Sequence, residues 1–206
     1  MNLVEERVAV KQLGRAGYEP ILAAMREFTA RRDAHTPDEL WLVEHPPVYT
    51  LGQGADPAHG PRLANGIPVL RADRGGEITY HGPGQAVLYA LVDLARRGLK
   101  VKRFVWLLEQ CAIDLVGGRA ARRPRAPGVY VDGAKVAALG VRISRGCSYH
   151  GLALNVDMDL APFAAIDPCG MPGLAVTDLK SLGIGLSAAQ AGARLAALLA
   201  RRLEHA

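Results

Sequence analysis

The hydrophobic and polar positions repeat with two different periods along the chain, and these periods predict helices and strands. Apolar residues spaced three and four apart indicate helices over Tyr18–Arg32 and Arg103–Val116. A further helix follows Ser187, because Ser187 and Gln190 form the pattern of a capping box, and it continues to about Leu203. Shorter apolar or alternating runs predict strands over Arg7–Leu13, Glu39–Glu44, Pro68–Arg71, Glu77–Tyr80, Ala86–Leu91, Val129–Val131, Ala134–Ile143 and Tyr149–Val156.

The order of these elements predicts an α+β fold. Asp132 and Gly133 separate two apolar runs, and Asp-Gly is a strong signal for a β-hairpin. Most strands follow one another in antiparallel runs, and the helices lie between and after them, so a repeated βαβ pattern is absent. A chain of 206 residues without a recognisable linker suits one domain spanning residues 1–206. We expect loops over Tyr49–Pro68 and Arg119–Pro127.

The composition excludes several classes of protein. Half of the residues are hydrophobic and 22% are charged, which is typical of a globular chain and not of a disordered one. No apolar run approaches the roughly 20 residues of a membrane span, and the acidic N-terminus does not resemble a secretion signal. The cysteines, Cys111, Cys147 and Cys169, are too few for a disulfide framework and indicate a reducing, cytosolic setting. Cys111 falls on the apolar face of its helix, so we expect it in the core.

The net charge of +5 is concentrated in one segment. Between Arg96 and Arg125 the chain carries nine basic residues against two acidic ones, Glu109 and Asp114. Such a patch is either an ordinary solvated surface or a binding surface. As a binding surface it would attract nucleic acid, a membrane surface or an acidic protein. Its aromatic residues, Phe104 and Trp106, occupy core-like positions, so we do not expect nucleic-acid binding.

Three segments carry candidate chemistry. Residues 74–85 combine closely spaced glycines with an arginine and a histidine, and they form either a tight turn or a surface that another group can approach closely. Lys135 is a single lysine in an apolar strand; it either reaches solvent or faces a pocket, where a desolvated lysine can act as a base. Cys169 lies in a loop rich in proline and glycine, which makes it the best candidate for a reactive thiol.

Taken together, these groups suit acyl transfer through a thioester. A thiolate is the nucleophile, an amine takes its proton, and backbone N–H groups of glycine-rich loops stabilise the oxyanion. A zinc site built from Cys147, His150, Cys169 and another histidine is an alternative, although a structural zinc site usually needs four well-spaced ligands.

From about Leu40 to Leu182, the chain resembles the lipoyl(octanoyl) transferase family. The resemblance rests on five ordered segments: Glu44–Gly52, Arg74–Gln85, Gly128–Arg142, His150–Asn155 and Asp167–Gly173. It implies that Cys169 is the nucleophile and Lys135 its partner. It also implies an acyl pocket lined by Arg74, Gly75, Gly76, Glu77, Ile78, Thr79, Tyr80, His81, Ala138, Leu139, Gly140, Gly151, Leu152 and Ala153. His45 and His150 are further pocket candidates, and Ala138 stands where the family often has serine.

The resemblance further implies the fold of biotin and lipoate protein ligases, a mixed sheet flanked by helices. The implied reaction moves an octanoyl or lipoyl group from acyl carrier protein to a specific lysine of a lipoyl domain. The acceptors are the lipoyl domains of 2-oxoacid dehydrogenase complexes and the glycine cleavage H protein. No ATP, metal or other cofactor is expected, because the donor thioester is already activated. Both partners are acidic as families and would suit the basic segment Arg96–Arg125.

Three rival functions remain open from the sequence. An ATP-dependent lipoate or biotin ligase of the same fold would need no cysteine. A Cys–His hydrolase would use His81 or His150 as its base and water as the acceptor. A non-catalytic module would bind zinc or nucleic acid.

Overall fold

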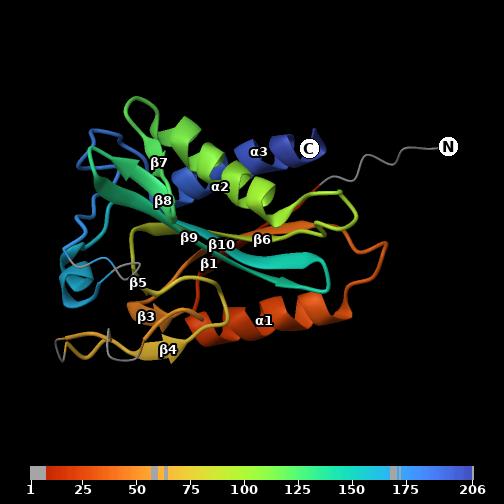
Figure 1. Cartoon of the computed structure of the whole chain (residues 1–206), viewed down its shortest axis with the longest axis horizontal. Helices are drawn as coiled ribbons and strands as arrows, with labels where there is room; N and C mark the ends of the chain where they lie inside the picture. Colours follow the sequence, from red (N-terminus) through yellow and green to blue (C-terminus); the bar gives the residue numbers. More distant parts are fainter. Residues whose placement is uncertain (1–7, 57–59, 63–64, 168–170, 172, 206) are drawn as a thin grey trace.

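A computed structural model describes residues 8–56, 60–62, 65–167, 171 and 173–205. Its main feature is a seven-stranded sheet, with a second sheet of three strands beside it (Figure 1). The large sheet has the order β1 (Ala9–Arg15), β2 (Glu39–Glu44), β6 (Gln85–Leu91), β10 (Cys147–Asn155), β9 (Ala134–Ser144), β8 (Ala126–Val131) and β7 (Ala121–Arg123). The small sheet has the order β4 (Val69–Arg71), β3 (Val48–Leu51) and β5 (Ile78–His81). Parallel pairs join β1 to β2 and β3 to β4, while the other pairs are antiparallel, so both sheets are mixed.

Helices cover both faces of the large sheet. Helices α2 (Val101–Val116) and α3 (Ala188–Glu204) lie on one face, where Phe104 and Leu195 join the main core. Helix α1 (Tyr18–Arg31) lies on the other face, and Met25 packs there with Trp41 of β2. The central strands are therefore buried on both sides. The predicted α+β class and the mixed sheet flanked by helices are confirmed, and Ser187 and Gln190 form the predicted capping box.

The two predicted loops are wrong in part, because pairing between distant segments overrides local signals. The first three residues of the first predicted loop, Tyr49–Leu51, belong to β3 (Val48–Leu51), which is buried between β4 and β5. The second loop contains β7 and the start of β8, which pair as a short hairpin around Pro124. The first strand also runs two residues further than Leu13, since a bulge after Gln12 keeps it paired with β2.

Close backbone contacts place the loop between β4 and β5 across the middle of β9. The Gly75 N–H donates to the carbonyl oxygen of Val141 at 3.0 Å. A Cβ atom on Gly140 would lie 2.7 Å from the Gly75 oxygen, and one on Gly151 would lie 2.2 Å from the Leu88 oxygen. These glycines are therefore required for backbone packing, which brings Arg74 and its neighbours to the centre of the sheet.

The basic segment separates into internal and exposed residues. Arg96 and Arg97 bind the buried carboxylate of Asp38, at 3.0 Å and 2.6 Å, and Arg122 binds Glu109 at 2.9 Å. Trp106 was predicted at a core-like position, and this is wrong. It is 37% exposed, and its ring lies between the guanidinium groups of Arg103 and Arg122, at 4.2 and 4.6 Å. Trp106 lies two residues from the buried Phe104, which places it on the opposite side of the helix.

Candidate active site

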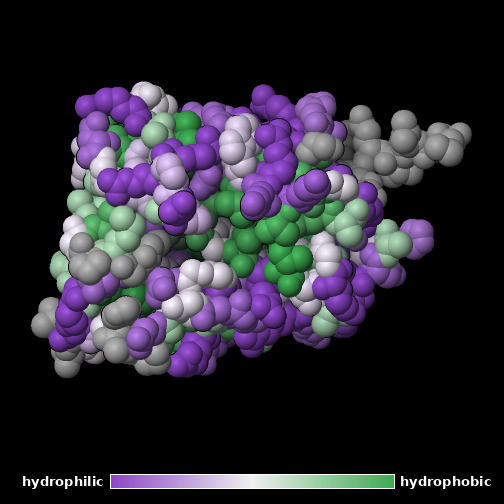
Figure 2. Space-filling view, in the orientation of Figure 1, coloured by the Kyte–Doolittle hydropathy of each residue, from purple (hydrophilic) through white to green (hydrophobic). Residues whose placement is uncertain are grey.

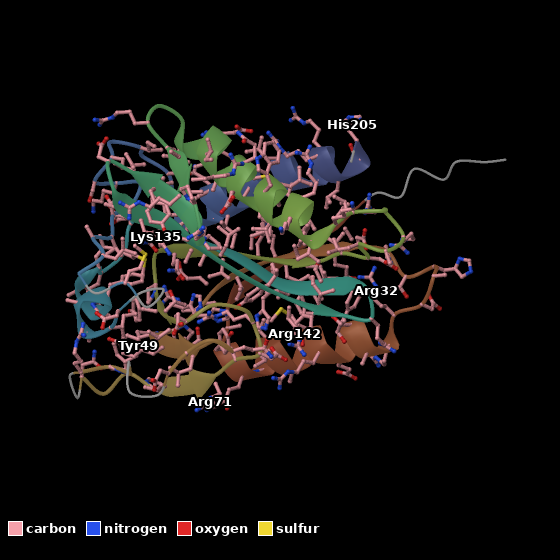
Figure 3. The ribbon with its side chains drawn as sticks, viewed as in Figure 1. Arg32, Tyr49, Arg71, Lys135, Arg142 and His205 are labelled. Carbon is pink, nitrogen blue, oxygen red and sulfur yellow. The ribbon has the colours of Figure 1, made fainter. Side chains whose placement is uncertain are left out.

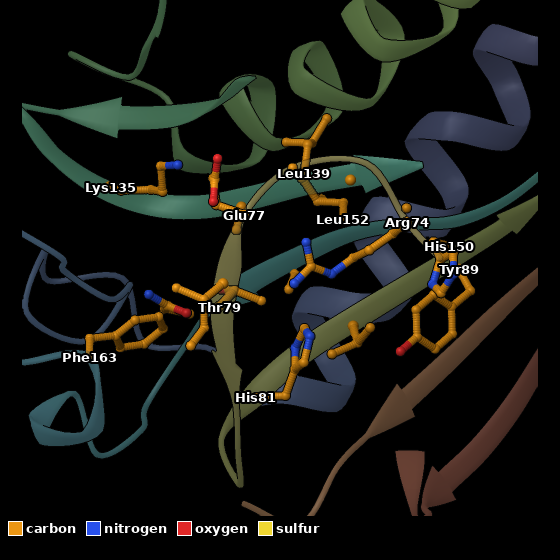
Figure 4. Close-up of a pocket in the computed structure, with 18 of the residues that line it drawn as sticks. Arg74, Glu77, Thr79, His81, Tyr89, Lys135, Leu139, His150, Leu152 and Phe163 are labelled. Atoms are coloured by element: carbon orange, nitrogen blue, oxygen red, sulfur yellow. The ribbon is translucent and has the colours of Figure 1, made fainter. Parts of the chain in front are cut away.

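A cavity lies where the β4–β5 loop and β5 face strands β9 and β10. Figure 4 shows Lys135 at one end of this cavity, with Tyr89 and His150 at the other. Most of the residues expected to line an acyl pocket do line this cavity: Arg74, Gly76, Glu77, Ile78, Thr79, His81, Ala138, Leu139, Gly140, Gly151, Leu152 and Ala153. Motifs far apart in the sequence therefore meet at one place, and Lys135 and His150 join them there.

Three of the expected residues do not line the cavity. Tyr80 is not among the lining residues, and its ring packs against Tyr49 and Phe163 with centroids 5.5 and 5.4 Å apart. Gly75 lines a neighbouring groove beside α2. His45 lies behind the cavity wall, where its ring contacts that of His81. The sequence analysis did not identify six further lining residues: Tyr18, Val87, Tyr89, Asn155, Phe163 and Val176.

Five of these residues lie outside the segments that carry the family resemblance, and the sixth, Asn155, ends one of those segments without having been identified as a lining residue. The only sequence signal that could have found some of them is the alternation along β6, where Val87 and Tyr89 point to the same face. Tyr18 and Phe163 come from segments that reach the cavity through tertiary packing alone.

Lys135 is buried, with 3% of its surface exposed, so the solvent-facing alternative is wrong. A register shift between Val129 and Tyr130 marks a bulge in the β8–β9 pair beside it. Bulges redirect side chains, and this one accompanies three consecutive buried residues from Lys135 onward. The side-chain nitrogen Nζ lies 3.5 Å from the Pro127 oxygen and 5.2 Å from the centre of the Tyr130 ring. Backbone hydrogen bonds to Ala175 and Thr177 hold Lys135 from the other side.

The predicted nucleophile, Cys169, lies outside the described residues. The two cysteines that the structure describes, Cys111 and Cys147, are both free and buried. Burial raises the pKa of the Cys111 thiol to about 12 and also raises the pKa of Cys147. Neither is therefore a thiolate near neutral pH. The expected place of Cys111 in the core is confirmed.

Two histidines, His81 and His150, line the inner end of the cavity, and His45 lies behind them. His81 donates from Nδ1 to the Gln85 side-chain oxygen at 2.7 Å, because the amide nitrogen of Gln85 donates elsewhere. His45 lies between the Ala16 oxygen at 2.7 Å and the Tyr89 hydroxyl at 2.8 Å. Burial lowers the pKa of His81 to about 3, with His45 and Arg74 contributing, and burial also lowers the pKa of His45. A group with a pKa near 3 is a weak base, so this arrangement does not favour the Cys–His hydrolase.

His150 is held by a partly exposed acid, Asp73. Its Nε2 lies 2.8 Å from Asp73, which also accepts from Tyr149 at 2.8 Å and Arg26 at 2.9 Å. Burial opposes ionisation of Asp73, but the hydrogen bonds from these three groups outweigh it and hold its pKa well below the usual range. Burial lowers the pKa of His150 more strongly than Asp73 raises it, so His150 is neutral and donates to the carboxylate.

Because these histidines have lowered pKa values, we expect the free energy of unfolding to fall in mild acid. Each has a lower pKa when folded than its unfolded value near 6.5, so below that pH the unfolded chain binds protons that the folded chain does not. Stability is then complete above about pH 6.5 and is lost as the pH falls, by up to ~1.4 kcal/mol per pH unit for His81. Urea unfolding between pH 7.5 and 5 measures this slope. The exposed His35 provides the control, since His35→Gln should leave the slope unchanged. A flat profile over this range would contradict the prediction.

Arg74 supplies a buried positive charge beside the cavity. Its Nη2 donates to the backbone and side-chain oxygens of Thr50, at 2.7 and 2.8 Å. A Cβ atom on Gly52 would lie 2.8 Å from Arg74 Nη1, so Gly52 leaves room for this guanidinium. The guanidinium is therefore fixed by β3 and suited to stabilise negative charge that develops nearby.

Two negative observations concern the described residues. Among them, no group of three or more histidine, cysteine or acidic residues is arranged to hold a metal ion. None of their helices is long and apolar enough to cross a membrane.

Comparisons with known proteins agree with this geometry. Residues 18–200 match the family model of the lipoyl protein ligase A/B catalytic domain. An octanoyltransferase from Dechloromonas aromatica is 57% identical over 198 residues, which cover 95% of this chain and 96% of that protein. An octanoyltransferase from Methylococcus capsulatus is 61% identical over 178 residues, which cover 85% and 86%.

Solved structures share the fold at low identity. A lipoate protein ligase from Thermoplasma acidophilum, solved in a study of that ligase and its E2 lipoyl domain, has a TM-score of 0.75 at 15% identity and covers 97% of this chain and 92% of its own. A biotin protein ligase from Aquifex aeolicus has a TM-score of 0.58 at 9% identity, with coverage of 95% and 70%. The chain therefore belongs to the lipoyl protein ligase A/B catalytic domain family, in which it groups with the octanoyltransferases and is an acyltransferase.

Proposed function

We propose that this chain, acting as one catalytic domain, transfers an octanoyl or lipoyl group from acyl carrier protein to a lysine of a lipoyl domain through a thioester on Cys169. The acceptors are the lipoyl domains of 2-oxoacid dehydrogenase complexes and the glycine cleavage H protein. The observation that carries this proposal is the buried Lys135 at the end of a largely apolar cavity, in a chain that is 57% identical to an octanoyltransferase. Its sparse cysteines suit a cytosolic location.

The reaction proceeds in two balanced steps. In the first, the Lys135 amine accepts the proton of the Cys169 thiol, and the thiolate attacks the thioester carbonyl of the donor. The carrier thiolate leaves and takes the proton back from Lys135, which leaves an octanoyl thioester on Cys169. In the second, the amine of the acceptor lysine attacks this thioester and forms an amide bond. Lys135 takes the surplus proton of the amine, and Cys169 leaves as the thiolate and regains that proton.

The cavity offers a binding site for the acyl chain. Its lining includes the aliphatic residues Ile78, Leu139 and Leu152, which suit a saturated chain. Burying such a chain contributes about 0.8 kcal/mol for each CH₂ group. The Lys135 end must then hold the reacting carbonyl, while the methyl end of the chain points toward Tyr89 and His150.

An intact-mass measurement tests the proposed function. The protein is mixed with octanoyl-loaded acyl carrier protein in the absence of ATP. We expect an octanoyl adduct that hydroxylamine removes, that a lipoyl domain discharges, and that does not form in Cys169→Ser. If no adduct forms and transfer needs ATP with free octanoate, the protein is an adenylate-forming ligase instead.

The exposed part of the basic segment is the proposed docking surface for the acidic partners. It consists of Lys100, Lys102, Arg103, Trp106, Arg119, Arg123 and Arg125, of which Arg119 also pairs with Asp132 at 2.9 Å. Three of these cations stand at the N-terminal end of α2, where the helix dipole is already positive and no acidic residue compensates it. A groove lined by Val105 and Arg125 shares Gly76, Glu77, Leu139 and Gly140 with the cavity, so this surface adjoins the cavity. Figure 2 shows apolar surface across the middle of the face in view, bordered by hydrophilic side chains.

Charge reversal on this surface is expected to slow the reaction with the acyl carrier protein. The double variant Arg103→Glu and Arg123→Glu should lower kcat/KM for the carrier substrate about 10-fold or more at low salt, and the deficit should shrink as salt screens the charges. Arg31→Glu on α1, on the opposite face of the sheet, is the matched control and should behave as the wild type. Arg122 is unsuitable for this test because it binds Glu109. Equal kinetics for the double variant and the control would contradict the docking surface.

A further inference from the structure

Helix α2 buries an acidic side chain that neither the sequence motifs nor the proposed reaction uses. Glu109 is 7% exposed and lies beside Leu108 on a helix that packs into the main core. A buried carboxylate is costly unless it is fully paired, and such a residue is rarely retained for packing alone.

Both carboxylate oxygens of Glu109 are occupied. Oε1 accepts the backbone N–H of Gly128 at 3.1 Å, and Oε2 accepts Nε of Arg122 at 2.9 Å. Arg122 is itself fixed, since it also donates to the Trp106 oxygen at 3.0 Å and to the Gln110 side-chain oxygen at 2.8 Å. The Glu109 carboxylate therefore has one orientation, set from the surface side by Arg122.

The N–H that Glu109 binds belongs to the same peptide group that contacts Lys135. This peptide joins Pro127 to Gly128, and its carbonyl oxygen accepts Nζ of Lys135 at 3.5 Å. Because Gly128 has no side chain, the end of the Lys135 side chain can pack directly against this peptide. A Cβ atom on Gly128 would lie 3.2 Å from Cε and 3.4 Å from Nζ of Lys135. One planar group thus has Glu109 on its N–H side and Lys135 on its C=O side.

We propose that Glu109 is a positioning residue for Lys135, acting through the Pro127–Gly128 peptide. A charge-assisted hydrogen bond on the N–H fixes the plane of the peptide and polarises its carbonyl oxygen. The carbonyl then holds the lysine nitrogen in one place, and proton transfer is sensitive to displacements of about 1 Å. This inference rests on the proposed function, in which Lys135 moves the proton.

The test compares Glu109→Gln with Asp114→Asn, a matched acid-to-amide change on the exposed side of the same helix. Glutamine keeps the size of the side chain but removes its charge and its pairing with Arg122. We expect Glu109→Gln to lower the single-turnover rate of acyl-enzyme formation about 10- to 50-fold, with KM for the donor little changed and the midpoint of the pH–rate profile shifted. Asp114→Asn should match the wild type in each respect. Wild-type rate and pH profile in Glu109→Gln would overturn the proposal.

A second readout does not depend on acyl transfer. The rate at which an amine-reactive acetylating reagent modifies Lys135, followed by peptide mass spectrometry across pH, reports the state of the lysine directly. We expect the pH at half-maximal labelling of Lys135 to shift in Glu109→Gln and not in Asp114→Asn, at temperatures where both are folded. If the wild type forms no acyl-enzyme but labelling of Lys135 still shifts in Glu109→Gln, the proposed function is contradicted and the positioning role is supported. An unshifted labelling profile with a lowered melting temperature makes Glu109 structural only and overturns the proposal.

Discussion

Lys135→Met is expected to lower octanoyl transfer by a factor of about 10² to 10⁴, the usual contribution of a positioned proton-transfer group. Methionine has a similar length and no charge, and the site of Lys135 is 3% exposed, so the folded protein should lose little stability. The measurement is the rate of acyl-enzyme formation, followed by intact mass in a single turnover, with the melting temperature recorded beside it.

Lys135→Arg separates two roles for the lysine. Arginine keeps a positive charge at the site but remains protonated and cannot take the proton of a thiol. If Lys135 moves a proton, the arginine variant should be as slow as Lys135→Met; if it only supplies charge, the arginine variant should retain much of the rate. Lys180→Met is the control, because Lys180 forms an exposed ion pair with Asp157 and should not affect the rate. A Lys135→Met variant within 10-fold of the wild type would contradict the assigned role.

The sequence predicted the strand that carries Lys135 and most of the residues that line the cavity, but not how deeply the lysine is buried. Lys135 stands alone in an apolar strand next to an Asp-Gly turn, and both signals are local, so its element and its unusual character were accessible. Its burial was not, because it depends on the bulge and on the backbone hydrogen bonds to Ala175 and Thr177. The role of Cys169 rests on its loop and on the family resemblance, and it stays a prediction.

The elements that the sequence analysis missed depend on long-range pairing. Strand β3 has four residues and is stabilised by two neighbours that lie about 20 to 30 residues further along the chain. Tyr18 enters the cavity wall only because α1 packs across the sheet, where its ring stacks on His81 with centroids 5.7 Å apart. Trp106 was misplaced because aromatic residues usually occupy a core, whereas here two arginines cover its ring.

The arginines at the start of the basic segment have a role in stability that charge counting did not show. Asp38 is 2% exposed, and it accepts hydrogen bonds from Arg32 at 2.6 Å, Arg96 at 3.0 Å and Arg97 at 2.6 Å. Burial alone would raise the pKa of Asp38, but the Asp93 N–H, Arg32 and Arg97 together lower it. Arg97 also donates to the Leu203 oxygen at 2.7 Å, so the cluster connects the start of β2 to the end of α3.

Asp38→Ala is therefore expected to destabilise the fold by about 3–5 kcal/mol, because it leaves the buried guanidinium of Arg32 and its neighbours without their shared anion. For a chain of this size, that loss corresponds to a drop in melting temperature of roughly 10 °C. Thermal unfolding measures it, and Glu27→Ala, which removes an exposed ion pair on α1, should change the melting temperature by less than about 2 °C.

The same variant also tests whether this cluster is separate from the catalytic site. Figure 3 places Arg32 and Lys135 toward opposite ends of the molecule. At a temperature where Asp38→Ala is fully folded, its transfer rate and the salt dependence of kcat/KM should therefore equal those of the wild type. A variant that melts normally but shows an altered salt dependence would mean that Arg96 and Arg97 also contact the acidic partner. The docking surface would then extend over the whole basic segment, from Arg96 to Arg125, instead of its exposed residues alone.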